Sequence, residues 1–231
     1  MSAEIKVSST ASAVAIGSQL LVDGGFESAT VGAGTWGHQA QVGGWKSDTQ
    51  VEVWNKGFYD LSPTEGNNFA ELDYDTRMSN IYQDVATEAG AEYTFSFDFM
   101  KRPDSKAGSD TVNVFWNGKL VGSVDPTKSE WSSAKFKVVG TGGQDRIEFR
   151  ESAEDNDSVG GLLDNASLTK TSLSVAEQAA KEAAEKAAAE QAAKEAAEKA
   201  AAEKAAKEAA EKAAAEQAAK EAAQKAAAEQ A

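Results

Sequence analysis

The residues best able to do chemistry are carboxylates that alternate with apolar side chains in short extended runs. In VEVWN, Glu52 and Trp54 alternate with Val51 and Val53. Successive residues of a strand point to opposite faces of a sheet, so the valines predict an inner face and Glu52 and Trp54 an outer one. A tryptophan ring can stack on the apolar face of a sugar while neighbouring carboxylates accept hydrogen bonds from its hydroxyls. The run therefore predicts an exposed ligand-binding surface.

Four further polar residues extend this candidate surface. Glu71 and Asp73 share one face of FAELD, and Asp98 lies on the outer face of YTFSFDFM. Arg102 follows that second run and can reach a ligand carboxylate or form a surface ion pair. The candidate ligand-binding residues are thus Glu52, Trp54, Glu71, Asp73, Asp98 and Arg102. The alternative for each polar residue is an ordinary solvated strand position, and alternation alone does not show that the six converge.

The composition restricts the chemistry further. The 231 residues include one histidine, His38, and no cysteine, which excludes disulfides and both thiolate and multi-histidine metal sites. The sequence contains no nucleophile elbow, phosphate-binding loop or metal-histidine motif, so we expect a binding protein and not an enzyme. The net charge of −14 disfavours nucleic acid as a partner, because phosphate binding needs clustered Lys and Arg. Since no segment is long and apolar enough to span a bilayer, we expect no membrane insertion.

The elements that must position these residues are short strands separated by Gly, Asn and Asp. Asn117-Gly118 between two of the runs is a hairpin signal. This pattern predicts an all-β fold, an antiparallel jelly-roll sandwich of about ten strands. No helical period of useful length appears before Val175, which disfavours a parallel α/β fold. The expected strands are 19–22, 51–55, 69–73, 81–85, 93–100, 111–116, 119–124, 133–139, 145–151 and 162–168.

The remaining aromatic side chains divide into two groups. Trp45 follows two glycines and Trp116 shares a face with two valines, so we expect both in the core. The others fall in longer connections, where the binding loops of sandwiches occur; these are Trp36, His38, Phe58 and Tyr59.

Several runs, taken in order, resemble a known family. They are LLVDGGFES, GGW, VEVW, GNNFAELD, IYQDV, YTFSFDF, VFWNGKLV, RIEFRE and GGLLDNASL, spread over residues 20–168. Together they resemble the galactose-binding-like jelly rolls of bacterial extracellular proteins, including carbohydrate-binding modules and ligand-binding domains of repeats-in-toxin adhesins. The resemblance implies a non-catalytic binding domain outside the cell.

The same resemblance implies a bound Ca²⁺. In such modules the first and last strands lie side by side, and a structural Ca²⁺ often sits between a Glu of the first and an Asp of the last. The matching positions are Glu27 and Asp164, and Asp23 stands where the family often has Asn. Carboxylates and backbone carbonyls are the hard oxygen ligands that Ca²⁺ takes. The alternative is that Glu27 and Asp164 cap turns.

The last 56 residues differ in kind from the rest. They consist of 30 Ala, 12 Glu, 9 Lys and 5 Gln in a repeat of thirteen residues, with no Gly or Pro. Helix propensity and Glu-to-Lys pairs four residues apart, such as Glu182 and Lys186, predict one long helix. Thirteen residues turn a helix by about 1,300°, so each repeat presents its alanines on a new side, which disfavours a coiled coil. We expect a single solvated helix about 84 Å long.

These inferences combine into one expectation. Residues 1–18 form an N-terminal extension, 19–171 a β-sandwich and 172–231 a helical spacer. The sandwich is expected to bind carbohydrate or peptide on a cell or matrix surface, in an adhesion-type role outside a bacterial cell and stabilised by Ca²⁺. The alternative is a structural subunit of a surface fibre, assembled through sandwich and helix.

Overall fold

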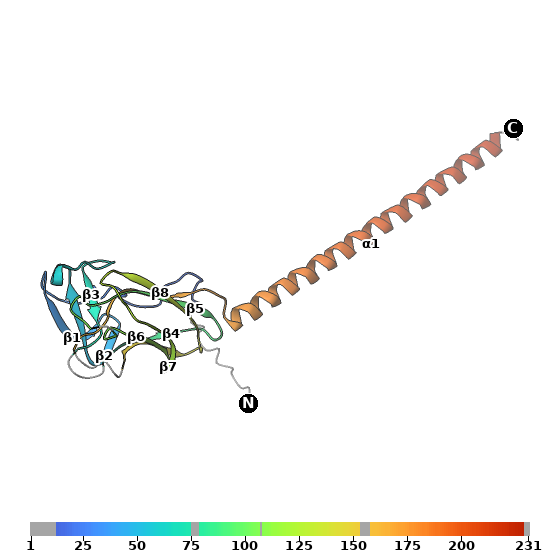
Figure 1. Cartoon of the computed structure of the whole chain (residues 1–231). Coiled ribbons are helices and arrows are strands. Elements are labelled where there is room, and N and C mark those ends of the chain that lie inside the picture. Colours follow the sequence, from blue (N-terminus) through green and yellow to red (C-terminus); the bar gives the residue numbers. More distant parts are fainter. Residues whose placement is uncertain (1–12, 75–78, 107, 153–157, 229–231) are drawn as a thin grey trace, which may run out of the picture. The chain divides into compact units, whose positions relative to one another are not determined.

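Within the described residues, the protein forms ten antiparallel strands, a short 3-10 helix and one long helix (Figure 1). The computed structural model describes residues 13–74, 79–106, 108–152 and 158–228. The chain falls into two compact units, Met1–Ala176 and Glu177–Ala231. The elements are β1 (Trp36–Val42), β2 (Trp45–Asn55), the 3-10 helix η1 (Phe58–Asp60), β3 (Asn68–Glu71), β4 (Asn80–Ala86), β5 (Glu92–Met100), β6 (Val112–Trp116), β7 (Lys119–Val124), β8 (Ser132–Val139), β9 (Gln144–Glu151), β10 (Leu162–Lys170) and α1 (Val175–Ala228).

The strands form one continuous, nearly closed sheet in the order β7-β6-β9-β4-β2-β3-β10-β5-β8, with β1 attached to β2. Strand β2 joins the two halves of the sheet. Its first part pairs with β4 through Lys46 and Tyr82, and its second part pairs with β3 from Glu52 to Asn55. The two terminal strands of the order, β7 and β8, also come into contact. The molecule is therefore an antiparallel sandwich whose halves share strand β2.

Aromatic side chains fill the space between the halves. Phe95 and Phe97 from β5 meet Phe149 from β9, with ring centroids 5.3 Å and 4.8 Å apart. Trp45 packs on the other side of Phe149 at 5.8 Å. These side chains are completely or almost completely buried, as the alternation of the strands predicts. Trp116 is also buried, so the expectation that Trp45 and Trp116 belong to the core is confirmed.

A second, smaller core covers the outer face of the sheet around Trp54. Its buried members are Trp54, Phe69, Met100 and Leu162, and Phe58, Leu61 and Trp131 pack over them. The prediction that Trp54 is an exposed aromatic is therefore wrong, since it is only 1% exposed. Side chains from connections between the strands cover it, and strand alternation contains no information about them.

Most of the expected strands are confirmed, with shifts of a few residues at their ends. The Asn117-Gly118 turn has positive φ at both residues, as a tight hairpin turn requires. Two expectations are wrong. Residues 19–22 contribute one isolated bridge, Gln19 to Thr169, and Trp36 and His38 lie on strand β1 and not in a connection. Strand β1 reads WGHQAQV, which has few strand-forming residues, so pairing with β2 decides its conformation.

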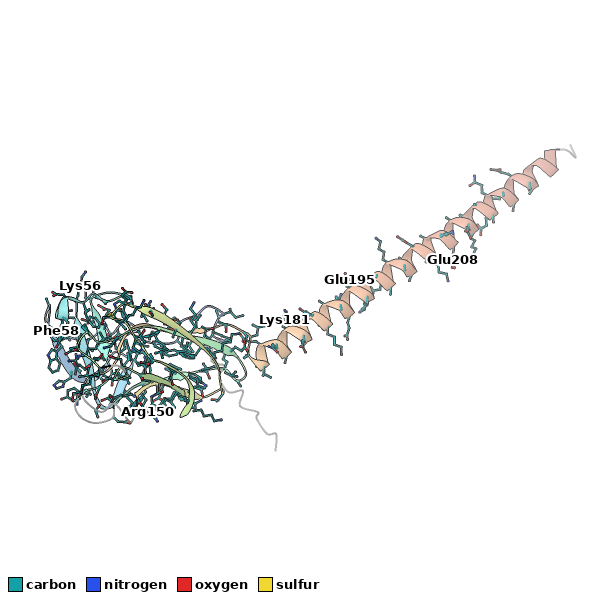
Figure 2. The ribbon with its side chains drawn as sticks, viewed as in Figure 1. Lys56, Phe58, Arg150, Lys181, Glu195 and Glu208 are labelled. Atoms are coloured by element: carbon teal, nitrogen blue, oxygen red, sulfur yellow. The ribbon has the colours of Figure 1, made fainter. Side chains whose placement is uncertain are left out.

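Helix α1 runs without interruption from Val175 to Ala228, about 81 Å at 1.5 Å per residue. Its described side chains are almost all exposed and project around the whole circumference (Figure 2). Two ion pairs, Lys181–Glu185 at 3.9 Å and Lys204–Glu208 at 4.0 Å, run from Lys to Glu, the reverse of the order favoured by the sequence. In the described chain, no helix is apolar enough over its length to cross a membrane.

We predict that Phe149→Ala lowers the free energy of unfolding of the sandwich by about 3–5 kcal/mol, because the substitution leaves a cavity between the two halves. Denaturant unfolding followed by tryptophan fluorescence measures the change. Leu120→Ala is the control, since Leu120 is 57% exposed on β7 and its loss should change stability by less than about 0.5 kcal/mol. Equal effects of the two substitutions would contradict this assignment of the core.

Candidate functional site

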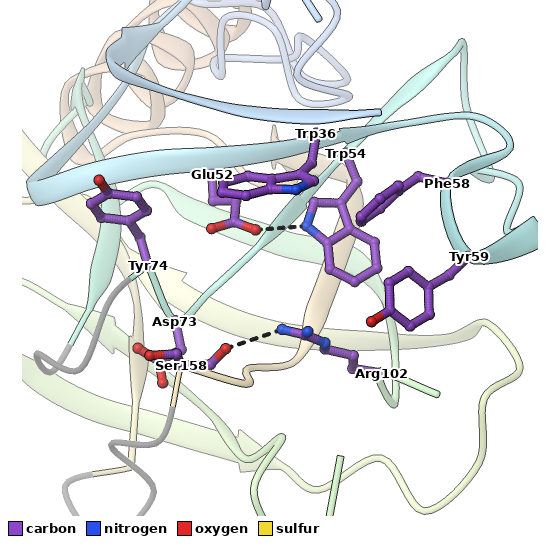
Figure 3. A pocket seen from close by; sticks show the side chains of 9 residues that line it. All are labelled: Trp36, Glu52, Trp54, Phe58, Tyr59, Asp73, Tyr74, Arg102 and Ser158. Atoms are coloured by element: carbon purple, nitrogen blue, oxygen red, sulfur yellow. Dashed lines mark hydrogen bonds between the residues drawn. The ribbon is translucent and has the colours of Figure 1, made fainter. Parts of the chain in front are cut away.

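A pocket of about 570 Å³ opens beside the second core (Figure 3). It is rich in aromatic rings and also contains carboxylates and a guanidinium. Strand β1 contributes one wall, the end of β2 the floor, and η1 and three connections the remainder. Its lining residues are Trp36, Glu52, Trp54, Phe58, Tyr59, Asp73, Tyr74, Arg102 and Ser158.

Trp54 anchors one side of the pocket. Its ring lies 4.7 Å from Phe58, edge to face, and 5.3 Å from Tyr59, nearly parallel. Its indole Nε1–H donates a hydrogen bond of 2.8 Å to Glu52 Oε1, as Figure 3 shows. Tyr59 has φ +54 and belongs to η1, a turn that folds back over the end of β2. Both the Trp54 ring and the Glu52 carboxyl are thus fixed in position.

Arg102 lies next to Trp54 and Tyr59 in the pocket lining, and its guanidinium is held from three directions. Nη1 donates to Glu71 Oε1 at 2.7 Å and to the carbonyl of Ser158 at 3.1 Å. Nε donates to Asp104 Oδ1 at 2.8 Å. The guanidinium carbon also lies 5.1 Å from the Trp54 ring centroid, within the range of a cation-π contact. Burial alone would lower the pKa of Arg102, but Glu71 and Asp104 outweigh it and raise the pKa above its ordinary value.

Glu52 and Glu71 form a carboxyl pair beneath the pocket. They are directly opposite each other on β2 and β3, so their side chains project to the same face of the sheet. Burial raises the pKa of Glu71 well above its ordinary value, and the charge of Glu52 raises it further. Burial also raises the pKa of Glu52, against the lowering effect of the hydrogen bond from Trp54. The pair therefore holds a proton more firmly than two isolated glutamates would.

The structure brings most of the predicted ligand-binding residues together. Glu52, Trp54, Asp73 and Arg102 line one pocket, and Glu71 binds Arg102 from below. Their predicted exposure is wrong for the carboxylates as well as for Trp54, because Glu52, Glu71 and Asp73 are 8%, 1% and 1% exposed. They lie on the outer face of the sheet, but the connections that build the pocket cover them.

Asp98 does not join the others. It lies on β5, outside the pocket lining, and its carboxylate accepts hydrogen bonds from Ser133 Oγ at 2.5 Å and Asn165 Nδ2 at 3.1 Å. Arg102 forms an ion pair with the exposed Asp104, as expected, but its own side chain is only 14% exposed.

Two pocket residues escaped the sequence analysis. Tyr74 directly follows Asp73, and an alternating run that ends in a tyrosine was a signal that could have found it. Ser158 enters the pocket through its backbone carbonyl and has φ +65, and neither property has a counterpart in the sequence pattern.

The three residues matched to a Ca²⁺ site lie outside the lining of this pocket. The segment containing Asp23 and Glu27 runs beside β10, as the resemblance implies, through the bond from Ala166 N to the carbonyl of Gly24. Asp164 Oδ2 accepts the backbone N–H groups of Thr64 and Glu65 at 2.6 Å and 2.9 Å. Glu27 Oε1 likewise accepts those of residues 67 and 68, and Asp23 those of residues 27 and 28. These are the turn-capping bonds of the alternative interpretation.

The oxygen atoms around Gly25 are nevertheless of the kind that Ca²⁺ prefers. A Cβ at Gly25 would lie 1.8 Å from Glu65 Oε2 and 3.6 Å from Asp164 Oδ1, so both carboxylates approach this backbone. Asp164 is completely buried, and burial raises its pKa to about 6 in spite of its N–H donors. Among the described residues, no three His, Asp or Glu side chains are gathered closely enough to form a metal site by themselves. The carboxylate oxygens are thus ligands of the kind that Ca²⁺ takes, but backbone carbonyls would have to supply the remaining ligands.

Comparisons with known proteins give relatives for the sandwich. No family model matches the chain. It is 32% identical over 147 residues to a multifunctional-autoprocessing repeats-in-toxin protein of Vibrio cholerae serotype O1, and 34% identical over 149 residues to one of Vibrio vulnificus. Each match takes in 63% of this chain, but the chain spans only 3% of the length of each relative.

Carbohydrate-binding modules are among the solved structures that resemble it. The tandem CBM22 domains of Paenibacillus barcinonensis Xyn10C match 71% of this chain and 48% of theirs, with 17% identity and a TM-score of 0.48. TmCBM61, solved with beta-1,4-galactotriose, matches 66% of this chain and 99% of its own, with 19% identity and a TM-score of 0.45. The resemblance to repeats-in-toxin proteins that the sequence indicates is confirmed.

We predict that Glu52→Gln becomes more stable relative to the wild type as pH rises from about 4.5 towards 8. A raised carboxyl pKa contributes stability below the unfolded-state value and loses that contribution as pH rises through the folded-state value. If the folded-state and unfolded-state pKa values differ by one, the contribution is about 1.4 kcal/mol. Urea unfolding of both proteins across this pH range measures the difference.

Asp84→Asn is the control of opposite sign. Asp84 binds Arg146 at 2.7 Å, and that hydrogen bond lowers its pKa, so this variant should lose stability relative to the wild type as pH rises from below the carboxyl's ordinary range. A flat difference curve for Glu52→Gln would contradict the proton-holding pair.

Proposed function

We propose that the sandwich is a non-catalytic binding domain and that its ligand, a carbohydrate, occupies the pocket between Trp36 and Arg102. The observation that carries this proposal is the meeting of exposed aromatic rings with fixed polar groups in one open pocket. Trp36 and Tyr59 are 48% and 44% exposed, although most large apolar side chains of the sandwich are buried. Exposed rings of this kind mark interaction sites.

The chemistry of the pocket suits a sugar ring, which has apolar faces and a hydroxylated rim. The rings offer stacking surfaces, and the groups between them offer both donors and acceptors. Arg102 Nη2 makes only a long bond of 3.4 Å to Asp104, so it has capacity to donate to a ligand hydroxyl. The Glu52 carboxyl, held by Trp54, is placed to accept from another. Both groups are fixed before a ligand arrives, which lowers the entropic cost of binding.

The arrangement of the carboxyls argues against glycoside hydrolysis. Glycosidases keep their two catalytic carboxyl groups roughly 5–9.5 Å apart, on either side of the bond to be cleaved. Glu52 and Glu71 instead face each other on neighbouring strands, and Glu71 is bound by Arg102 and the N–H of Gly160. These bonds leave Glu71 buried beneath the pocket and away from any substrate bond.

The similarity to repeats-in-toxin proteins of two Vibrio species supports the wider setting of this proposal. We place the domain outside a bacterial cell, in an adhesion-type role, with the sandwich arranged as a jelly roll. The tail is proposed as a spacer, because α1 is long and has no apolar face with which to pack.

A structural Ca²⁺ belongs to the same proposal. Asp164 and Glu65 would supply carboxylate ligands near Gly25 and backbone carbonyls would complete the set, whereas Asp23 and Glu27, whose carboxylate lies against Gly66, would brace the neighbouring turns. None of these four carboxylates forms an ion pair with a Lys or Arg of the described chain, so a cation would supply the positive charge that their surroundings lack. The ion would stabilise the folded state and take no part in ligand chemistry.

We predict that Trp36→Ala weakens carbohydrate binding about tenfold, the loss expected for roughly 1.4 kcal/mol of ring stacking. A glycan array identifies the sugars bound by the wild type, and titration calorimetry measures the change in Kd. Trp36 is a better test than Trp54, whose removal would also damage the second core. Leu120→Ala is the matched control and should bind as the wild type does. Selection from a peptide library, with no glycan bound, would overturn the carbohydrate assignment.

We predict that EDTA lowers the Tm of the sandwich by about 5–10 °C, the shift expected if Ca²⁺ contributes about 3 kcal/mol. Differential scanning calorimetry with and without added CaCl₂ measures it. Asp164→Asn should abolish the response to EDTA, whereas Asp84→Asn should retain it. An unchanged Tm of the wild type in EDTA would leave the turn-capping role as the whole function of these carboxylates.

A further inference from the structure

Three rings continue outward from the pocket along strand β1. Trp36 and His38 are two residues apart on β1, so they project to the same face. Their ring centroids are 6.2 Å apart, and the Tyr74 ring follows at 4.5 Å from His38. The Tyr74 hydroxyl lies 3.5 Å from His38 Nε2. We call Trp36, His38 and Tyr74 the ring row.

The ring row is open to solvent and lies at an edge of the sheet. Trp36 and His38 are exposed, and Tyr74 is half-buried. Among the described strands, β1 pairs with β2 alone, so no neighbouring strand covers the far side of the row. No other described part of the sandwich combines several exposed rings in this way; its remaining exposed large apolar residues are aliphatic apart from Tyr59.

The ring row and the pocket form one continuous surface. Trp36 and Tyr74 line the pocket and also belong to the row (Figure 3). His38 is the cross-strand partner of Glu52, so the row runs beside the carboxyl that we propose accepts a ligand hydroxyl. The surface thus offers an inner position, between Glu52, Tyr59 and Arg102, and an outer one over His38 and Tyr74. A pocket of 570 Å³ lies in the range of multi-ring ligands and exceeds the need of one sugar.

The charges around this surface disfavour an acidic ligand. Arg102 is the one Lys or Arg among the described lining residues, and its charge is already matched by Glu71 at 2.7 Å and Asp104 at 2.8 Å. A ligand carboxylate or sulfate at the inner position would meet Glu52 and Glu71 with no free cation to balance it. Among the residues of β1, only His38 has an ionisable side chain, and that side chain faces the outer position.

We propose that the pocket and the ring row bind an uncharged linear polysaccharide over at least two consecutive sugar units lying along β1. This proposal rests on the carbohydrate-binding function proposed above. The inner position fixes one unit through hydrogen bonds, and the ring row stacks on the next. Affinity therefore depends on the number of sugar units in the ligand. Mutations at the outer position should change this length dependence, whereas mutations at the inner position should change the affinity for a single unit.

Titration calorimetry of the full chain tests this with xylo-, cello- and β-1,4-galacto-oligosaccharides of one to six units, and with oligogalacturonides as the acidic series. We expect affinity for at least one uncharged series to rise about tenfold or more between one and three units and then to level off. Oligogalacturonides should bind at least tenfold more weakly than the best uncharged series. His38→Ala should remove the gain with length and leave the affinity for one unit unchanged, since His38 does not line the pocket. Tyr74→Ala should also remove the gain with length, and because Tyr74 lines the pocket as well, only the length dependence of this variant is compared with the wild type.

Leu120→Ala is again the matched control, and thermal unfolding verifies that each variant folds. A wild-type affinity that does not depend on length overturns the extended site while leaving carbohydrate binding intact. The same holds if both ring-row variants keep the full length dependence, or if oligogalacturonides bind best. Failure of every oligosaccharide to bind the wild type overturns the proposed function itself.

Discussion

Burial of strand β2 on both faces is the constraint on which the rest of the structure depends. Val51 and Val53 point into the main core, whereas Glu52 and Trp54, on the opposite face, are covered by a second core and a pocket wall. A strand that also joins the two halves of the sheet cannot shift its register by one residue without exchanging these sets. Because the register is fixed in this way, the positions of Glu52 and Trp54 within the pocket are fixed as well.

The double burial also explains the electrostatics of the site. Glu52 and Glu71 face each other across β2 and β3 in a place where water is largely excluded, so ionising both would be costly. Arg102 compensates part of this cost through its ion pair with Glu71. Hydrogen bonds therefore hold the Glu52 carboxyl in a fixed position, and packing fixes the aromatic rings beside it. Such preorganisation is what a binding site needs, and it follows from the fold.

The sequence predicted those features that depend on local alternation. The alternation along β5 predicts that Tyr93, Phe95 and Phe97 point inward, and all three are buried. The covering of the outer face could not be predicted, because it depends on where η1, Leu61 and Trp131 fold in three dimensions. Strand β1 was missed for a similar reason, since its conformation comes from pairing with β2. The convergence of Glu52, Asp73 and Arg102 depends on these same tertiary contacts. Alternation could therefore identify the three residues as candidates, but it could not predict that they lie close together.

The tail follows a different physical rule from the sandwich. In α1 almost every described side chain is exposed, so burial contributes little and helix propensity must support the structure. Each thirteen-residue repeat also turns its pattern by about 220° beyond whole turns, so no apolar stripe can accumulate along the length. A helix built in this way gains length with each repeat but gains no specific surface. Specific recognition must therefore come from the sandwich, where burial has fixed chemically distinct groups at defined positions.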